Sequence, residues 1–368
     1  MKMIYLDNAA TTKIDEKALD VYNYFSKVDF FNPSAVYATK NSICLKEARQ
    51  AISKKLGFED LDNVIFTASA TEANNLAFSC ASNDFVISNG EHPSVYDMAI
   101  HIKETKRVSL CPLSKNGEID YEELEKILTP DTKFISVMHV SNETGAINDL
   151  EKINSIRNKI CPHALLHVDG VQAFCKIDFN MKKSGVDLYT ISGHKIGAPK
   201  GIGALIFKNK NKLKPIIFGG GQEFNLRSGT ENLPAIMSLK YVVETRKPDP
   251  NYIKSLKNVL LNELTDKDIK INCEGGSPYI LSLSFIGVRG ETYVSMLHDR
   301  GVLVSTGSAC SSKKKGNRIL TNMGYKEDRI ISSVRVSFFE TNTVEEVSQA
   351  GKIMLNTYHE LKEKMNVQ

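Results

Sequence analysis

Short apolar segments alternate with helical patterns between about residues 60 and 210, and this alternation limits the fold more than any other feature. Strands joined by helix-length connections pair in parallel, because a parallel crossover needs a dozen or more residues. The sequence therefore predicts an α/β fold in which helices cover a mostly parallel sheet. The strand-sized segments are Val64–Thr67, Phe85–Ser88, Phe134–Val140, Leu165–Asp169, Leu188–Ile191 and Gly203–Phe207.

The pattern changes around Lys247–Pro250. A chain of 368 residues exceeds the size at which one hydrophobic core keeps growing, so two domains are expected. We place a large domain at residues 13–247 and a small α/β domain at residues 1–12 and 248–368. The small domain is predicted to contain a helix at Tyr252–Leu264, strands at Ile280–Phe285, Val302–Ser305 and Val334–Phe338, and a closing helix.

Composition and cysteine usage exclude several classes of protein. The net charge of +4 is slight for this length and no long basic run dominates, so direct nucleic-acid binding is not expected. The apolar start of the chain is too short for a signal peptide, and no apolar run approaches membrane-spanning length. The seven cysteines form no CxxC pair and are interpreted as reduced thiols. We expect a cytoplasmic protein without a membrane segment.

Two predicted strands end in residues that suit one cofactor. The strand over Tyr189–Ser192 breaks at Gly193 and is followed by Lys195, and the strand over Leu165–Asp169 ends in a carboxylate. A partly desolvated lysine can form a Schiff base, and a carboxylate can keep a pyridine nitrogen protonated. Together they meet the needs of pyridoxal phosphate (PLP). A lysine after a strand is by itself more often a solvated loop residue.

Further polar residues follow other strands. His92 could stack on a cofactor ring and exchange protons near pH 7, although a single loop histidine is usually structural. Asn142 also follows a strand. Ala70 and Thr71 open a predicted helix whose Ser69–Glu72 spacing is that of a capping box, and such a helix start can hold a phosphate. Ser192 and His194 could donate to the same phosphate. Their convergence at one edge of the sheet predicts a single crevice.

Cys310 differs from the other cysteines because it lies in a loop of small residues, Ser305–Ser312. The run Lys313–Lys315 follows closely, and nearby positive charge lowers the pKa of a thiol. The alternative is an incidental exposed cysteine beside a solubilising basic run. Arg335, in a predicted strand, could pair with a substrate carboxylate or act as a structural salt-bridge partner.

The chain resembles the NifS/IscS-type cysteine desulfurases of the class V aminotransferase group over nearly its whole length. The motifs that carry the resemblance occur in the family's order and are Tyr5–Thr12, Asn32–Ser34, Thr67–Glu72, Glu91–His92, Asn142–Gly145, His167–Gln172, Ser192–Lys195, Gly219–Gln222, Arg227–Asn232 and Ser308–Cys310. The resemblance implies the PLP-dependent transferase fold (fold type I), with a mostly parallel seven-stranded sheet and a smaller C-terminal domain.

The resemblance also implies roles for individual residues. Lys195 would hold PLP as a Schiff base, and Cys310 would take the sulfur of L-cysteine as a persulfide. Arg335 with Asn142 would fix the substrate carboxylate, near Asn32. The remaining cofactor contacts would come from Ala70, Thr71, His92, Asn142, Asp169, Gln172, Ser192, Gly193 and His194, with Thr230 reaching the cofactor of the second subunit of a homodimer.

Several positions depart from the family's pattern: Phe31, Gly170, Cys175, Phe224–Asn225 and Phe338–Glu340. None removes a catalytic group, but arginines are lost and the family's longer C-terminal tail is missing. We therefore expect a sulfur-acceptor protein whose identity is open between iron–sulfur cluster assembly and tRNA or cofactor thiolation. The alternative functions are a selenocysteine lyase or aminotransferase of the same fold, and a sulfur-relay protein without turnover.

Overall fold

The computed structural model describes residues 3–58, 63–209, 212–306 and 317–366. Cys310 and Lys313–Lys315 lie outside these ranges. The predicted seven-stranded sheet is confirmed, with the order β2-β8-β7-β6-β5-β3-β4. Every neighbouring pair is parallel except the two made by β8, which runs antiparallel to β2 and β7. The strands are β2 (Val64–Thr67), β3 (Phe85–Ser88), β4 (Val108–Cys111), β5 (Phe134–Met138), β6 (Leu165–Asp169), β7 (Leu188–Ser192) and β8 (Gly203–Phe207).

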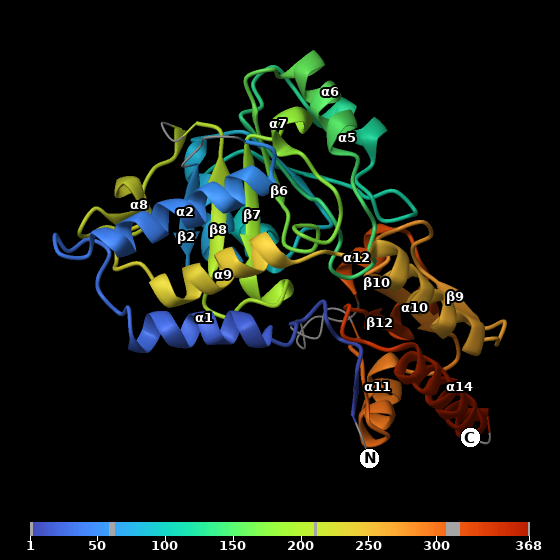
Figure 1. Cartoon of the computed structure of the whole chain (residues 1–368). Helices are drawn as coiled ribbons and strands as arrows, with labels where there is room; N and C mark the ends of the chain where they lie inside the picture. The colour runs from blue at the N-terminus through green and yellow to red at the C-terminus, as the bar shows by residue number, and fades with distance from the viewer. Residues whose placement is uncertain (1–2, 59–62, 210–211, 307–316, 367–368) are drawn as a thin grey trace.

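Both faces of this sheet are buried. Alternate residues of a strand point to opposite faces, so on β3 Phe85 and Ile87 pack on one face and Val86 on the other. Figure 1 shows α1, α2 and α9 crossing one face of the sheet. The helices on that face are α1 (Glu16–Lys27), α2 (Thr39–Lys55), α5 (Tyr121–Ile127), α6 (Leu150–Ile160) and α9 (Leu233–Thr245), and those on the other are α3 (Ala70–Ala77) and α4 (Pro93–Ile102). Short turns of helix occur at η1 (Phe78–Cys80), α7 (Met181–Ser184), η2 (Gly193–Lys195) and α8 (Gln222–Asn225).

The C-terminal part builds a second core. Its three-stranded sheet has the order β12-β10-β9, with both pairs antiparallel. The strands of this sheet are β9 (Ile269–Ile271), β10 (Ile280–Phe285) and β12 (Ser333–Ser337). A fourth strand of the C-terminal part, β11 (Val302–Leu303), lies outside this sheet. The helices are α10 (Pro250–Glu263), α11 (Gly290–Asp299), α12 (Arg318–Asn322), α13 (Glu327–Ile331) and α14 (Val344–Asn366).

The start of the chain packs with this second core. Strand β1 (Ile4–Tyr5) pairs in parallel with β11, and Ile4 and Leu6 are buried among residues of α10, α11 and α14. In Figure 1 the N-terminus lies beside α11, far from α1. The division into residues 13–247 and residues 1–12 with 248–368 stays a proposal, and this packing supports it. No helix among the described residues is long and apolar enough to cross a bilayer.

Candidate active site

The carboxyl ends of four strands bring the predicted residues to one edge of the large sheet. His92 follows β3, Asn142 follows β5, Asp169 is the last residue of β6, and Lys195 ends the η2 turn after β7. Strands β3, β5, β6 and β7 are parallel neighbours, so their carboxyl ends share one edge. This is where open α/β sheets bind their ligands.

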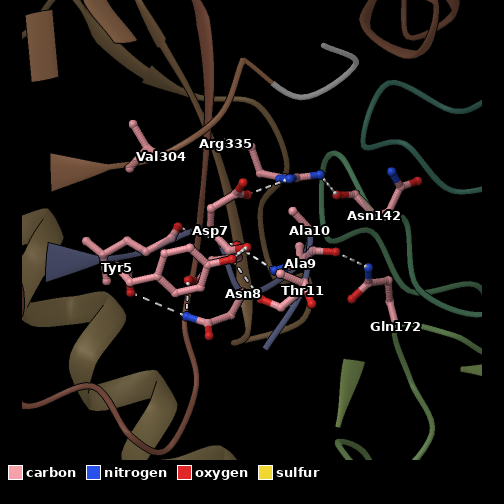
Figure 2. Close-up of polar contacts among 12 residues, drawn as sticks. Tyr5, Asp7, Asn8, Ala9, Ala10, Thr11, Asn142, Gln172, Val304 and Arg335 are labelled. Carbon is pink, nitrogen blue, oxygen red and sulfur yellow. Dashed lines mark hydrogen bonds and ion pairs between the residues drawn. The ribbon is translucent and has the colours of Figure 1, made fainter. Parts of the chain in front are cut away.

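The Lys195 amine is held by the N-terminal segment. Its Nζ donates to the carbonyl oxygens of Ala9 and Ala10, both at 2.6 Å. Gln172 Nε2 also donates to Ala9 O, at 2.9 Å, and Gln172 Oε1 accepts from the buried Lys176 Nζ at 3.0 Å. Figure 2 shows this segment lying between Gln172 and Arg335. Sequence reasoning assigned no role to Ala9 and Ala10, because backbone carbonyls leave no side-chain signal.

Asp169 is a buried carboxylate with neutral donors. Its Oδ2 accepts from Asn74 Nδ2 at 2.9 Å and its Oδ1 accepts from the Val171 N–H at 3.0 Å. Within the ranges that the structure describes, no salt bridge reaches Asp169. Buried charges need a partner of opposite charge, and a protonated pyridine nitrogen would supply one. Asn74 was missed because a buried asparagine inside a helix looks like any other polar helix residue.

The start of α3 forms one of the two bonds of the predicted capping box, and the returning bond of Glu72 goes to the residue before the N-cap Ser69. Ser69 Oγ accepts from the Glu72 N–H at 3.2 Å, and Glu72 Oε2 accepts from the Ala68 N–H at 2.9 Å. Gly203 on β8 packs closely against this helix start. A Cβ on Gly203 would lie 2.8 Å from Ala70 N, so a larger residue would not fit there. In the first turn of a helix the backbone N–H groups have no intrahelical acceptor, so those of Ala70 and Thr71 suit a phosphate.

His194 is held in the neutral form in contact with the N-terminal segment. Its Nδ1 is 3.0 Å from Thr11 Oγ1, and its carbonyl oxygen accepts from the Thr12 N–H and hydroxyl. Burial, followed by the charge of Lys195, lowers its pKa to about 4. The expected role as a phosphate donor is compatible with this neutral ring. Ser192 is buried at the end of β7, opposite Gly203.

Arg335 carries both a salt bridge and an unpartnered nitrogen. Its Nη2 donates to Asp7 Oδ1 at 2.6 Å and its Nη1 to the Asn142 carbonyl at 3.0 Å (Figure 2). Arg335 Nε and Asn142 Oδ1 are buried and have no hydrogen-bond partner within the described ranges. Such orphan groups cost free energy unless a ligand satisfies them. Asp7 lies inside a motif of the resemblance, but sequence reasoning gave it no role.

Three predicted residues are not gathered into this cluster. Thr230 is exposed and lines a hollow of about 210 Å³ with Thr67 and Arg227, and Arg227 pairs with Glu72 of α3. Asn32 is exposed, and its Oδ1 accepts from the Ser34 N–H at 2.9 Å. Cys310 cannot be placed from the described residues. In the part of the chain that the structure describes, no group of three or more His, Cys, Asp or Glu side chains could hold a metal ion.

Two departures from the family's pattern have a structural account. A Cβ on Gly170 would lie 2.0 Å from the ring of Tyr189, so glycine here accommodates a tyrosine on the neighbouring strand. Cys175 adopts φ +54°, a left-handed conformation that glycine takes without strain. Gly170 lies within the Asp169–Gln172 segment, and Cys175 follows it.

Phe224 and Glu340 stand where the family has arginines, and Phe31 stands where it has a glycine. The ring of Phe224 lies 4.8 Å from the Arg49 guanidinium, and Arg49 forms a buried salt bridge with Glu223. Glu340 accepts from Arg246 Nη2 and from the Tyr279 hydroxyl, each at 2.7 Å. Phe31 is exposed and stacks on Phe30. The consequences for partner binding stay a prediction.

The fold and the site define a class of enzyme. A seven-stranded sheet with Lys195 and Asp169 at the ends of neighbouring strands is the arrangement of PLP-dependent enzymes of fold type I. The uncompensated charge of Asp169 and the open helix start at Ala70–Thr71 fit that cofactor.

Comparison with known proteins specifies the family. The aminotransferase class-V model matches residues 4–350, so the chain belongs to this family of PLP-dependent enzymes. It is 33% identical to a putative cysteine desulfurase IscS 1 of Bacillus subtilis (strain 168), covering 96% of this chain and 97% of the relative. It is 35% identical to a NifS/IcsS protein homolog of Lactobacillus delbrueckii subsp. bulgaricus, covering 94% and 95%. The predicted resemblance is confirmed.

Solved structures show the same fold. A NifS-like protein superimposes with a TM-score of 0.90 at 30% identity, covering 98% of this chain and all of the other. A structure described as SspA in complex with cysteine superimposes with a TM-score of 0.81 at 28% identity, covering 91% and 98%.

Proposed function

We propose that the protein is a cysteine desulfurase, which converts L-cysteine to L-alanine and takes the sulfur on Cys310 as a persulfide. The observation that carries this proposal is the buried Arg335 Nε, which has no hydrogen-bond partner among the described residues and belongs to a side chain bonded to the N-terminal segment at Asp7. A free amino acid offers a carboxylate for the guanidinium. The relatives named cysteine desulfurase, which match over nearly the whole chain, favour cysteine as that amino acid.

PLP would be held by the residues at the carboxyl ends of the strands. Lys195 would bond to it, Asp169 would pair with its ring nitrogen, and Gln172 would donate to its ring hydroxyl. His92 would stack on its ring. Its phosphate would be bound by Ala70, Thr71, Ser192, Gly193 and His194. When bound, PLP withdraws electrons from the Cα of an amino acid and so weakens the bonds around it.

Lys195 would take the Cα proton of the substrate at Nζ and return it later. The carbonyls of Ala9 and Ala10 lie 2.6 Å from this nitrogen, so they can keep the free amine in place. Arg335 would orient the substrate by donating to its carboxylate, and Asn142 would donate to the same carboxylate from Nδ2. Holding both reacting groups in a fixed geometry supplies much of the rate enhancement in such reactions.

Cys310 would attack the sulfur of the substrate as a thiolate. A sulfur–sulfur bond forms, the carbon–sulfur bond breaks, and its electron pair stays on the carbon fragment, which takes up protons to become L-alanine. All six described cysteines have a raised pKa, with burial as the largest cause, so they are weak nucleophiles.

The described residues before and after 307–316 form hydrogen bonds with residues of the proposed substrate site. Ser305 and Arg335 exchange two backbone hydrogen bonds, and Asn317 Nδ2 donates to Glu143 Oε2 at 2.6 Å. These contacts support delivery of Cys310 to the substrate bound at Arg335.

A homodimer is part of the proposal. Phe30, Val36, Tyr37 and Phe218 are between 64% and 98% exposed, more than a monomer usually leaves open in large apolar side chains. The Phe218 loop is bridged to the Thr230 loop through Ile217 and Arg227. Burying this surface between two subunits would bring Thr230 toward the cofactor of the second subunit, and Asn32 toward the substrate.

The persulfide would pass to an acceptor protein in the cytoplasm. Candidate acceptors serve iron–sulfur cluster assembly or the thiolation of tRNA or a cofactor. The replaced arginines at Phe224 and Glu340 favour an acceptor surface different from that of relatives that keep them.

The test is to incubate the holoenzyme with L-cysteine and quantify alanine and sulfide with a reductant present. Equimolar alanine and sulfide are expected, and Cys310→Ala should abolish both. The matched control is Cys273→Ala, since burial raises the pKa of Cys273 to about 11. Alanine from L-selenocysteine alone would favour a selenocysteine lyase, and amino-group transfer from L-glutamate an aminotransferase. No conversion of any amino acid would favour a sulfur-relay protein.

A further inference from the structure

The imidazole of His92 has a defined tautomer. His92 is the N-cap of α4, and its Nδ1 lies 3.1 Å from the backbone nitrogen of Ser94 and 2.8 Å from Ser94 Oγ. A backbone N–H can only donate, so Nδ1 must accept. The neutral ring therefore carries its proton on Nε2.

The Ser94 hydroxyl is oriented from its other side. Asn74 Nδ2 donates to Ser94 Oγ at 2.8 Å and to Asp169 Oδ2 at 2.9 Å. An ionised carboxylate can only accept, so Asp169 fixes which end of the Asn74 amide faces these two oxygens. Because Ser94 Oγ accepts from Asn74, its own proton is free to point at His92 Nδ1. A directed chain thus joins Asp169, Asn74, Ser94 and His92.

The surroundings of His92 favour its neutral form. Burial lowers its pKa, and the nearby Lys195 and Arg318 act in the same direction. The carboxylates of Asp169 and Asp97 oppose this but do not reverse it. A proton added at Nδ1 would also have to displace both donors from Ser94. The ring lines a hollow of about 490 Å³ together with Thr71, Asn75 and Ser94.

We propose that Ser94 and Asn74 are positioning residues that hold His92 as a neutral Nε2–H donor. In this arrangement His92 donates a hydrogen bond into the site, and removal of the substrate Cα proton falls to Lys195. The inference rests on the proposed function only for the identity of that reaction. From the sequence we expect His92 to exchange protons near pH 7, whereas the proposed arrangement makes it a hydrogen-bond donor.

The test is nitrogen NMR of the holoenzyme with ¹⁵N-labelled histidine, in which the His92 signals are identified by their loss in His92→Gln. We expect Nδ1 unprotonated and Nε2 protonated in the neutral ring at pH 8. Ser94→Ala removes one donor to the neutral ring, so the protonation of His92 should shift upward by about 0.7 pH unit, the equivalent of one neutral hydrogen bond. Asn74→Leu should shift it in the same direction.

Ser94→Thr keeps the hydroxyl and should restore the titration of wild-type His92. A several-fold fall in kcat with unchanged KM should accompany Ser94→Ala. A protonated Nδ1 in the wild type would overturn the proposal without any variant, as would an unshifted titration in Ser94→Ala. The NMR signal does not depend on alanine formation. A failure of this proposal is therefore distinguishable from a failure of the proposed function.

Discussion

The cofactor side and the substrate side of this site differ in how far their polar groups are satisfied by hydrogen bonds. On the cofactor side Lys195, Asp169 and Gln172 already have hydrogen-bond partners, from the side chain of Asn74 and from the backbone of the N-terminal segment. On the substrate side Arg335 Nε and Asn142 Oδ1 are buried and have no hydrogen-bond partner in the part of the chain that the structure describes. The first arrangement holds its groups in position before anything binds, whereas the second leaves polar atoms for a ligand to satisfy. The segment Asp7–Ala10 contacts both sides.

The largest expected effect comes from removing the amine on the cofactor side. Lys195→Ala should lower the rate of alanine formation by about 10³-fold or more, because general acid–base catalysis by one group contributes up to about 10⁴-fold. Lys200→Ala, at an exposed position nearby, should keep the wild-type rate. Steady-state assays with L-cysteine measure both variants, and an active Lys195→Ala enzyme would refute the assigned role.

Acid should weaken the large sheet through its buried neutral histidines. Burial lowers the pKa of His139 to about 4, and its Nδ1 lies 3.0 Å from the Tyr189 hydroxyl. Between pH 6.5 and 4 the unfolded chain binds the proton and the folded chain does not, so stability falls as the pH falls. For this histidine the loss should be about 2 kcal/mol at pH 5 and about 3 kcal/mol at pH 4. Urea unfolding at pH 7.5 and 5 measures it, and His139→Gln should flatten the dependence.

The close packing of Gly170 against Tyr189, next to Asp169, can be tested by adding a methyl group at Gly170. Gly170→Ala should destabilise the fold by about 1–3 kcal/mol, because the new methyl group overlaps the ring of Tyr189. Tyr189→Leu in the same chain should recover part of this loss. Denaturant unfolding of the single and double variants gives the coupling between the two positions. Strictly additive effects would contradict the overlap.

The smallest effect is expected on the substrate side. Asp7→Asn keeps an acceptor for Arg335 Nη2 but removes a negative charge that competes with the substrate carboxylate. KM for L-cysteine should fall by about threefold, equivalent to about 0.6 kcal/mol, with kcat unchanged. Asp20→Asn, at an exposed position in α1, is the control. A raised KM would show that Asp7 aids binding of the substrate.

The sequence predicted the side chains at the strand ends better than the groups between them. Lys195, Asp169 and His92 could be found because each follows an apolar run that marks a strand. Strand β4 was missed, since Val108–Cys111 is only partly buried and its pattern is short. Ala9, Ala10 and Asn74 were missed as functional groups because backbone carbonyls and a helical asparagine carry no distinctive pattern. Asp7 gained its significance only from its distance to Arg335.

The central claim is that Lys195 handles the carbon and proton chemistry while Cys310 takes the sulfur. The most direct test is a single turnover with L-cysteine, without reductant or acceptor, followed by mass spectrometry of the digested protein. The proposed mechanism predicts one additional sulfur atom on the peptide containing Cys310, in a one-to-one ratio with alanine. Alanine formed without added sulfur on Cys310, or an extra sulfur on another cysteine, would contradict it.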